Sequence, residues 1–75
     1  MTTTDIKVII PAYNEADSIA LVIKAFPETV SEIIVINNNS TDATALNAQK
    51  AGATVLNEHR KGYGYACLSG LNYIS

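Results

Sequence analysis

Three short apolar runs, separated by segments with helical periodicity, constrain the fold of this chain more than any other feature. The first run covers residues 6–10, the second covers residues 32–36 and the third covers residues 53–57. A crossover of about twenty residues between the first two runs suits a parallel βαβ unit, which needs a dozen or more. The sequence therefore predicts parallel strands that are buried on both faces.

The segments between and after these runs are patterned as helices. The first helix is expected from Asn14 to Pro27, with Asn14 as a candidate N-cap and apolar residues at i, i+3, i+4 and i+7: Ile19, Val22, Ile23 and Phe26. The second is expected over residues 41–51, capped by Ser40 or Thr41 and ended by Gly52. The third is expected over residues 65–74.

The order βαβαβα predicts an α/β fold: a three-stranded parallel sheet with flanking helices, a partial Rossmann-like half of a doubly wound sheet. We expect residues 1–75 to be a single, truncated domain, because the first strand of such a sheet is normally interior and would here leave one edge unpaired. That open edge also predicts a homo-oligomer in which the first strand pairs with a second copy. A self-associating binding or assembly module is therefore one alternative function.

Charge and composition exclude several classes of partner. The net charge is −2, and the only basic cluster is His59-Arg60-Lys61, so we expect no nucleic-acid partner. No run approaches the ~20 apolar residues that span a bilayer, so no transmembrane segment is predicted. The single cysteine, Cys67, is interpreted as a buried side chain in a reducing compartment, which favours a cytoplasmic location.

Polar loops follow each predicted strand, at the carboxyl edge where ligands bind in open parallel sheets. They are residues 11–15, residues 37–42 and residues 58–64. In the first loop, Pro11 is expected to end the strand. Tyr13 could stack on a nucleobase or simply pack, and Glu15 could bond a base or ribose hydroxyl or only favour the helix dipole.

The second and third loops leave similar alternatives. Turn chemistry accounts for Asn38, Asn39 and Ser40 without a ligand, whereas Asn37 could present its amide to a base. In the third loop, Arg60 and Lys61 could reach the phosphates of a nucleotide diphosphate. The full Gly-x-Gly-x-x-Gly pattern is missing, which disfavours a dinucleotide site. A nucleotidyltransferase fragment, a further alternative, would favour a glycine-rich basic loop after the first strand.

Taken together, the stretches VIIPAYNEADSI, EIIVINNNSTDAT and GATVLNEHRKGYGYACLSGL resemble the start of glycosyltransferase family 2 over residues 6–72. These are inverting GT-A enzymes that use nucleotide-diphosphate sugars. Within the family, the sequence most resembles polyprenyl-phosphate mannosyl- and glucosyltransferases. The resemblance implies binding of a UDP- or GDP-linked sugar and, in the complete enzyme, transfer to a polyprenyl phosphate or glycan. It also implies that this chain alone is inactive and that the full-length protein works at the inner face of the membrane.

The resemblance assigns nucleotide binding, position by position, to residues of the three loops and to the backbone near Val35. They are Pro11, Ala12, Tyr13, Glu15, Val35, Asn37, Asn39, Arg60, Lys61 and Gly62. The family usually has aspartate where this chain has Asn37, which bears on base preference. An Mg²⁺ or Mn²⁺ cofactor is implied, held by an Asp-x-Asp motif that this sequence lacks. No catalytic residue or metal ligand is therefore expected here.

Overall fold

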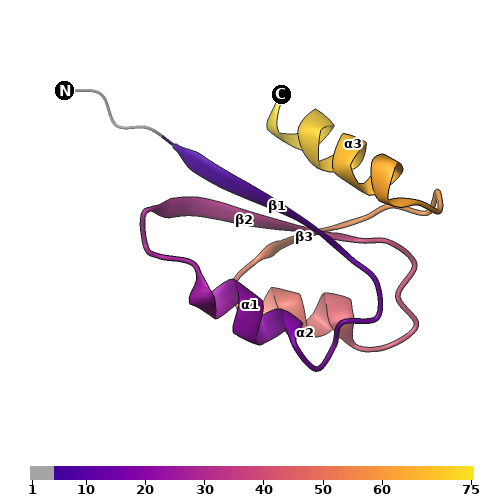
Figure 1. Ribbon diagram of the computed structural model, residues 1–75, viewed down its shortest axis with the longest axis horizontal. Coiled ribbons are helices and arrows are strands. Elements are labelled where there is room, and N and C mark those ends of the chain that lie inside the picture. Colours follow the sequence, from indigo (N-terminus) through magenta and orange to yellow (C-terminus); the bar gives the residue numbers. More distant parts are fainter. Residues whose placement is uncertain (1–4) are drawn as a thin grey trace.

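The computed structural model describes residues 5–75. Its elements are β1 (Ile6–Ala12), α1 (Ile19–Ala25), β2 (Val30–Asn37), α2 (Thr44–Lys50), β3 (Thr54–Asn57) and α3 (Tyr63–Ile74). β2 pairs in parallel with β1 on one side and with β3 on the other. Figure 1 shows α1 and α2 on one face of the sheet and α3 on the other. The predicted three-stranded parallel α/β fold is confirmed.

Two small cores lie on the two faces of the sheet. On the side of α1 and α2 the buried residues are Ala12, Ile19, Ile23, Val35, Ala48 and Ala53. On the side of α3 they are Ile34, Ile36 and Ala66. Because successive residues of a strand point to opposite faces, the apolar run of β2 supplies both cores. This is why that run does not alternate with polar residues.

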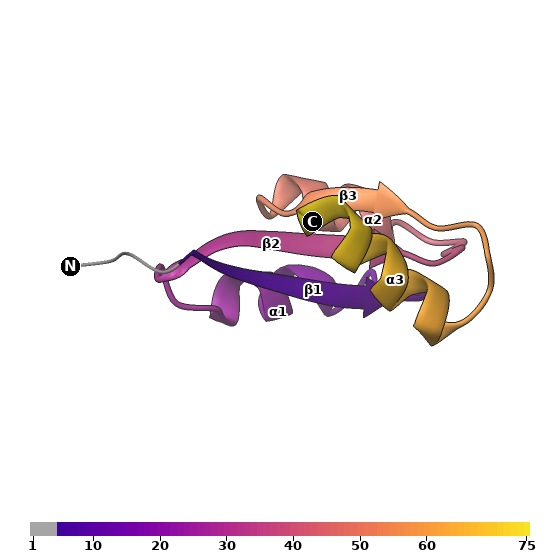
Figure 2. The same cartoon turned by 90° about the horizontal axis from the view of Figure 1, so that it is seen from above.

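A glycine lets α3 approach the sheet closely. A Cβ atom at Gly70 would lie 2.5 Å from Cγ2 of Ile9, closer than real contacts allow. Viewed from above, α3 crosses over β1 and β2 (Figure 2). The position of α3 therefore depends on the absence of a side chain at Gly70.

Pro11 lies within β1 and does not end it, so that prediction is wrong. The strand continues to Ala12, and Pro11 is in register with Ile36 of β2. The Ala12 carbonyl accepts a hydrogen bond from the Asn38 N–H at 2.9 Å and so faces β2. Since backbone polar groups alternate in direction along a strand, the nitrogen of Pro11 faces away from β2. A proline is tolerated there because no ladder hydrogen bond is lost to β2.

Two helices begin later than predicted, and their predicted caps are wrong. α1 begins at Ile19, and Asn14 has a φ of +52°, which is not helical. α2 begins at Thr44, with Ala43 at its N-cap position and no capping side chain. The polar side chains expected to cap these helices bond to neighbouring loops instead.

The predicted end of the second helix near Gly52 is confirmed, because α2 stops at Lys50 and Gly52 has a φ of +101°. α3 begins at Tyr63, two residues earlier than predicted. Within residues 5–75, none of the helices is both long and apolar enough to cross a membrane.

Candidate functional site

The loops after the three strands meet at one edge of the sheet. The arrowheads of β1 and β3 point to the same side in Figure 2, and β2 runs parallel to both strands. The Asn38 N–H donates to the Ala12 carbonyl at 2.9 Å, and the Glu58 N–H donates to the Asn37 carbonyl at 3.0 Å. The expectation that the three polar loops share one rim is therefore confirmed.

Reciprocal hydrogen bonds fasten the first loop to the second. The Asn14 N–H donates to Oγ of Ser40 at 3.0 Å, and the Thr41 N–H donates to Oδ1 of Asn14 at 2.8 Å. Asn14 adopts its left-handed backbone conformation at this point, which asparagine tolerates better than most residues. Asn14, Ser40 and Thr41 thus join two loops, and none of them caps a helix.

Asp42 and Thr44 complete this junction. The Glu15 N–H donates to Oγ1 of Thr44 at 2.8 Å, and the Ala16 N–H donates to Oδ2 of Asp42 at 3.2 Å. The Thr44 hydroxyl and N–H both donate to Oδ1 of Asp42. These bonds, that of the Thr44 hydroxyl above all, hold the pKa of Asp42 below its usual value. The N–H groups of Glu15 and Ala16 are therefore already occupied by protein oxygens.

The asparagines after β2 hold the loop after β3. Nδ2 of Asn38 donates to the carbonyls of Glu58 at 2.9 Å and Arg60 at 2.8 Å, and Oδ1 of Asn38 accepts from the Gly62 N–H at 3.2 Å. Only one orientation of the carboxamide satisfies two carbonyls and one N–H. Nδ2 of Asn39 donates to the His59 carbonyl at 3.1 Å. Their role is thus wider than local turn chemistry.

Asn37 is engaged at both ends of its side chain. Its Nδ2 donates to Oδ1 of Asn57 at 3.0 Å, and its Oδ1 accepts from the Ser40 N–H at 3.2 Å. An aspartate, which is usual at this position in the family that the sequence resembles, could not donate to Asn57. The amide therefore links the ends of β2 and β3 as a donor, whereas a carboxylate could do so only by accepting from Nδ2 of Asn57.

An ion pair between buried Glu58 and exposed Arg60 shapes the third loop. Glu58 is only 8% exposed, and its carboxylate accepts from the N–H, Nε and Nη2 of Arg60 at 2.8, 3.0 and 2.8 Å. The guanidinium carbon of Arg60 also lies 4.4 Å from the ring centre of Tyr65. Hydrogen bonds from Arg60 lower the pKa of Glu58 to about 2. Arg60 thus contacts the loop through Glu58 and α3 through Tyr65, while 55% of its side chain stays exposed.

Two adjoining cavities open at this rim and share Tyr13 and Asn38. The Tyr63 cavity has a volume of about 260 Å³ and is lined by Pro11, Ala12, Tyr13, Glu15, Asn38, Tyr63 and Ala66. The Lys61 cavity has a volume of about 490 Å³ and is lined by Tyr13, Asn38, Asn39, Thr41 and Lys61. Sequence reasoning missed Tyr63 and assigned Asn38 to the turn. Two sequence features could have indicated these residues: Tyr63 is an aromatic residue beside Gly62, and Asn38 is an amide close after a strand.

Six of the ten predicted binding residues lie at these two cavities, and four do not. Pro11, Ala12, Tyr13 and Glu15 line the Tyr63 cavity, Asn39 and Lys61 line the Lys61 cavity, and Gly62 lines a hollow beside the start of α3. Asn37 and Arg60 bond to other protein groups, as described above. The side chain of Val35 is fully buried in the core and reaches no cavity.

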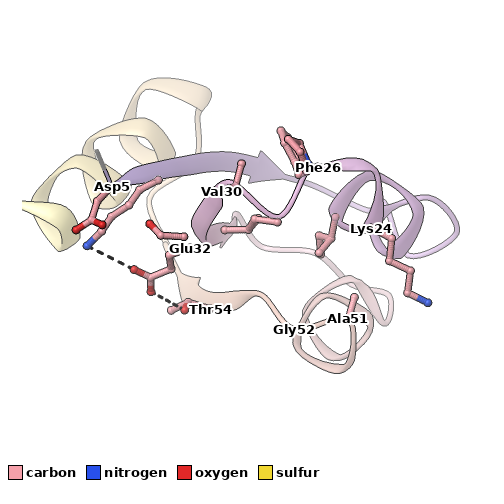
Figure 3. A pocket seen from close by; sticks show the side chains of 13 residues that line it. Asp5, Lys24, Phe26, Val30, Glu32, Ala51, Gly52 and Thr54 are labelled. Carbon is pink, nitrogen blue, oxygen red and sulfur yellow. Dashed lines mark hydrogen bonds and ion pairs between the residues drawn. The ribbon is translucent and has the colours of Figure 1, made fainter. Parts of the chain in front are cut away.

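A larger cavity of about 680 Å³ lies at the opposite edge, where the strands begin (Figure 3). Lys7 and Glu32 line it and pair with each other at 3.7 Å. Thr54 donates to Glu32 at 2.8 Å. None of the three carboxyl-edge loops reaches this cavity. In open parallel sheets ligands bind at the carboxyl edge, so we place the candidate site there despite the smaller volumes.

The described part of the chain contains no cluster of three or more histidine, cysteine, aspartate or glutamate side chains that could hold a metal ion. The rim loops contain three acidic residues, Glu15, Asp42 and Glu58; Asp42 is bonded to Ala16 and Thr44, and Glu58 is bonded to Arg60. The residues present therefore do not fit the Mg²⁺ or Mn²⁺ implied by the resemblance.

Comparison with known proteins decides the family. Residues 7–75 match the family model described as Glycosyl transferase family 2. The chain belongs to glycosyltransferase family 2. Membership in this family decides against the alternative of a nucleotidyltransferase fragment.

Curated relatives of this family 2 chain are longer proteins. It is 50% identical over 62 residues to protein RfbJ of Shigella flexneri, covering 80% of this chain and 48% of RfbJ. It is 40% identical over 68 residues to glycosyltransferase AglJ of Haloferax volcanii, covering 88% of this chain and 22% of AglJ. The chain thus spans less than half the length of these relatives.

Solved structures agree with the family and the fold. A crystal structure of glucosyl-3-phosphoglycerate synthase from Mycobacterium tuberculosis in complex with UDP superposes with a TM-score of 0.84 and 32% identity. The match covers 95% of this chain and 30% of that one. The same enzyme has been solved with Mn²⁺, UDP-glucose and glycerol 3-phosphate. The predicted GT-A family fold is confirmed.

Proposed function

We propose that this chain is the nucleotide-diphosphate-sugar-binding portion of an inverting glycosyltransferase. One observation carries the proposal: three polar loops are fastened together at the carboxyl edge, around two cavities that share Tyr13 and Asn38. The UDP bound to a structural neighbour with 32% identity supports a uridine nucleotide. A GDP-linked sugar is the alternative donor.

The Tyr63 cavity is proposed to take the base and ribose. Pro11 and Ala12 give it an apolar wall, and the rings of Tyr13 and Tyr63 offer surfaces for stacking. The Glu15 carboxylate can accept hydrogen bonds from ribose hydroxyls. Asn37 and Val35 are given no direct side-chain contact, because the first bonds to other protein groups and the second is buried.

The diphosphate is proposed to lie at the Lys61 cavity, which Asn39 also lines. Residues 14–16 cannot offer their N–H groups, because Ser40, Thr44 and Asp42 occupy those groups. The ion pairs within residues 5–75 are Lys7–Glu32 and Arg60–Glu58, and Lys61 has none there. Lys61 is therefore the cation proposed to contact the phosphates, next to Gly62. Arg60, which was predicted to share this role, is held by Glu58 instead.

The transfer reaction requires more than these residues supply. In the complete enzyme a divalent cation would neutralise the departing diphosphate during an in-line displacement, but residues 5–75 hold no suitable ligand set. We propose that this chain alone binds the donor without turning it over. Two statements about the full-length protein stay predictions: that its acceptor is a polyprenyl phosphate or glycan, and that it works at the inner face of the membrane. Phosphoglyceric acid in a neighbour's structure supports a small phosphorylated acceptor equally well.

Amide NMR during titration with UDP, GDP and uridine tests this proposal. We expect UDP to move the signals of Tyr13, Glu15 and Lys61 first. Lys61→Ala should weaken UDP about tenfold, since a hydrogen bond to a charged group contributes about 1.5–3 kcal/mol, and should leave uridine almost unchanged. Lys24→Ala, which makes the same change at the end of α1, is the matched control. Signals that stay still at millimolar UDP and GDP would remove the nucleotide-binding function.

Self-association through β1 is a second proposal and is compatible with the first. The backbone groups of Lys7 and Ile9 point away from β2, because the Ala12 carbonyl faces β2 and backbone polar groups alternate in direction along a strand. This edge has no partner strand among residues 5–75. Sedimentation across a range of concentrations checks the proposal, and a monomer at the highest concentration would contradict it.

A further inference from the structure

We infer that Glu58 is a positioning residue for diphosphate binding, although its charge has the same sign as the ligand. By holding Arg60, Glu58 fixes the loop between β3 and α3 so that Lys61 is directed into the Lys61 cavity. This inference rests on the proposed function. It goes beyond it by assigning a role to a side chain that lines neither of the two cavities.

Three hydrogen bonds join Glu58 to Arg60. Both carboxylate oxygens bond to Arg60, one of them to the backbone N–H and Nε and the other to Nη2. A carboxylate that is only 8% exposed is costly unless it is paired and hydrogen-bonded, and Arg60 meets both needs. The pair is braced by Tyr65, whose ring lies under the guanidinium. Arg60 is thereby kept from turning toward a ligand.

The opposite side of the loop is held by Asn38. Its carboxamide bonds the Arg60 carbonyl at 2.8 Å and the Gly62 N–H at 3.2 Å, which are the backbone groups on either side of Lys61. Gly62 has a φ of +124°, a conformation that side-chain-bearing residues rarely adopt. Lys61 therefore stands between two fixed points, and its side chain lines the cavity with Tyr13 and Thr41.

Electrostatics and positioning predict opposite results when the charge of Glu58 is removed. A carboxylate near a diphosphate repels it, so a purely electrostatic effect of Glu58→Gln is tighter UDP binding. The variant would also release Arg60, and an arginine free to bond phosphate would tighten binding further. If Glu58 acts by positioning the loop, the same variant weakens UDP binding. The sign of the change therefore separates the two mechanisms.

The experiment compares UDP and uridine affinities of the whole chain by amide NMR. We expect Glu58→Gln to weaken UDP about tenfold and to change uridine by less than about twofold, as for the loss of one charge-assisted contact. Loop movement should appear without ligand as a shift of the Gly62 amide signal. Glu28→Gln makes the same change of charge at an exposed position between α1 and β2 and should alter neither affinity.

Arg60→Lys is the second variant, because it keeps the positive charge but loses the bidentate contact with Glu58. It should also weaken UDP more than uridine, and it decides the matter if Glu58→Gln does not fold. UDP binding that is unchanged or tighter in the folded variants overturns the positioning role and leaves the proposed function standing. A wild-type chain that binds no nucleotide overturns the proposed function, and with it this role.

Discussion

The two edges of the sheet use polar side chains differently. At the carboxyl edge, Asn14, Asn38 and Asp42 bond mainly to backbone groups of another loop. At the amino edge, Glu32 bonds to side chains: Lys7 at 3.7 Å, Thr54 at 2.8 Å and Tyr73 at 2.8 Å. The bonds to backbone at the carboxyl edge fix the paths of loops, whereas the bonds of Glu32 tie β2 to β1, β3 and α3.

This difference suits the two edges to different tasks. Loops at the carboxyl edge have no ladder of their own, so their shape depends on bonds such as those of Asn38. The cavities between those loops are only as well defined as the bonds themselves. The amino edge has a larger cavity, but its lining charges Lys7 and Glu32 already satisfy each other (Figure 3). Cavity volume alone is thus a poor basis for choosing the candidate site.

The largest expected effect comes from breaking the junction of the first two loops. Thr44→Val keeps the shape of a fully buried side chain but removes the hydroxyl that joins the Glu15 N–H to Asp42. We expect the free energy of unfolding to fall by about 2 kcal/mol, since the hydroxyl makes two hydrogen bonds and each contributes about 0.5–1.5 kcal/mol. Urea unfolding measures the change. Thr29→Val, at an exposed site, is the control, and equal midpoints for the two variants would contradict the role of Thr44.

A smaller effect is expected from acid. The pKa of Glu58 is lowered from 4.5 to about 2 by the hydrogen bonds from Arg60. A group whose pKa is lower in the folded state stabilises the fold above its unfolded pKa, and that stabilisation is lost as the pH falls through its folded pKa. The stabilisation by Glu58 should therefore be complete above pH 4.5 and disappear toward pH 2.

Urea midpoints measured against pH check this expectation. The wild-type midpoint should fall between pH 4.5 and 2, and Glu58→Gln should flatten that fall. Asp42 and Glu32, whose pKa values are also lowered, change stability in the same direction and remain in both proteins. A Glu58 carboxyl carbon that titrates near 4.5 by NMR would show that its pairing with Arg60 is absent in solution.

The smallest effect is expected at the amino edge. Tyr73→Phe removes the hydroxyl that donates to Oε2 of Glu32, while Thr54 and Lys7 keep their contacts with that carboxylate. We expect a slight fall in the urea midpoint and no movement of the Tyr13 or Gly62 amide signals, because the variant lies at the far edge from the rim. A shift of those two signals would mean that the two edges are coupled through α3.

The rim could be predicted because strand direction follows from apolar runs and crossover length. The runs at residues 6–10 and 32–36 were long enough to identify two parallel strands, and the polar loops after them had to meet at one edge. Pro11 was misplaced because a sequence does not show which side of a strand has a neighbour. Asn14 was misplaced because its cap signal is local, whereas its partner Thr41 lies in another loop.

Periodicity was thus sufficient for the order of strands and helices, since burial of apolar residues repeats along the chain and can be counted. The family was indicated by the resemblance of three motifs and not by periodicity or composition. Periodicity could not predict three features of the third loop. They are the pairing of Glu58 with Arg60, the hydrogen bonds from Asn38 to this loop and the exposure of Lys61. A polar side chain has several partners of similar strength, and its choice depends on which distant segments the fold brings within about 3 Å of it.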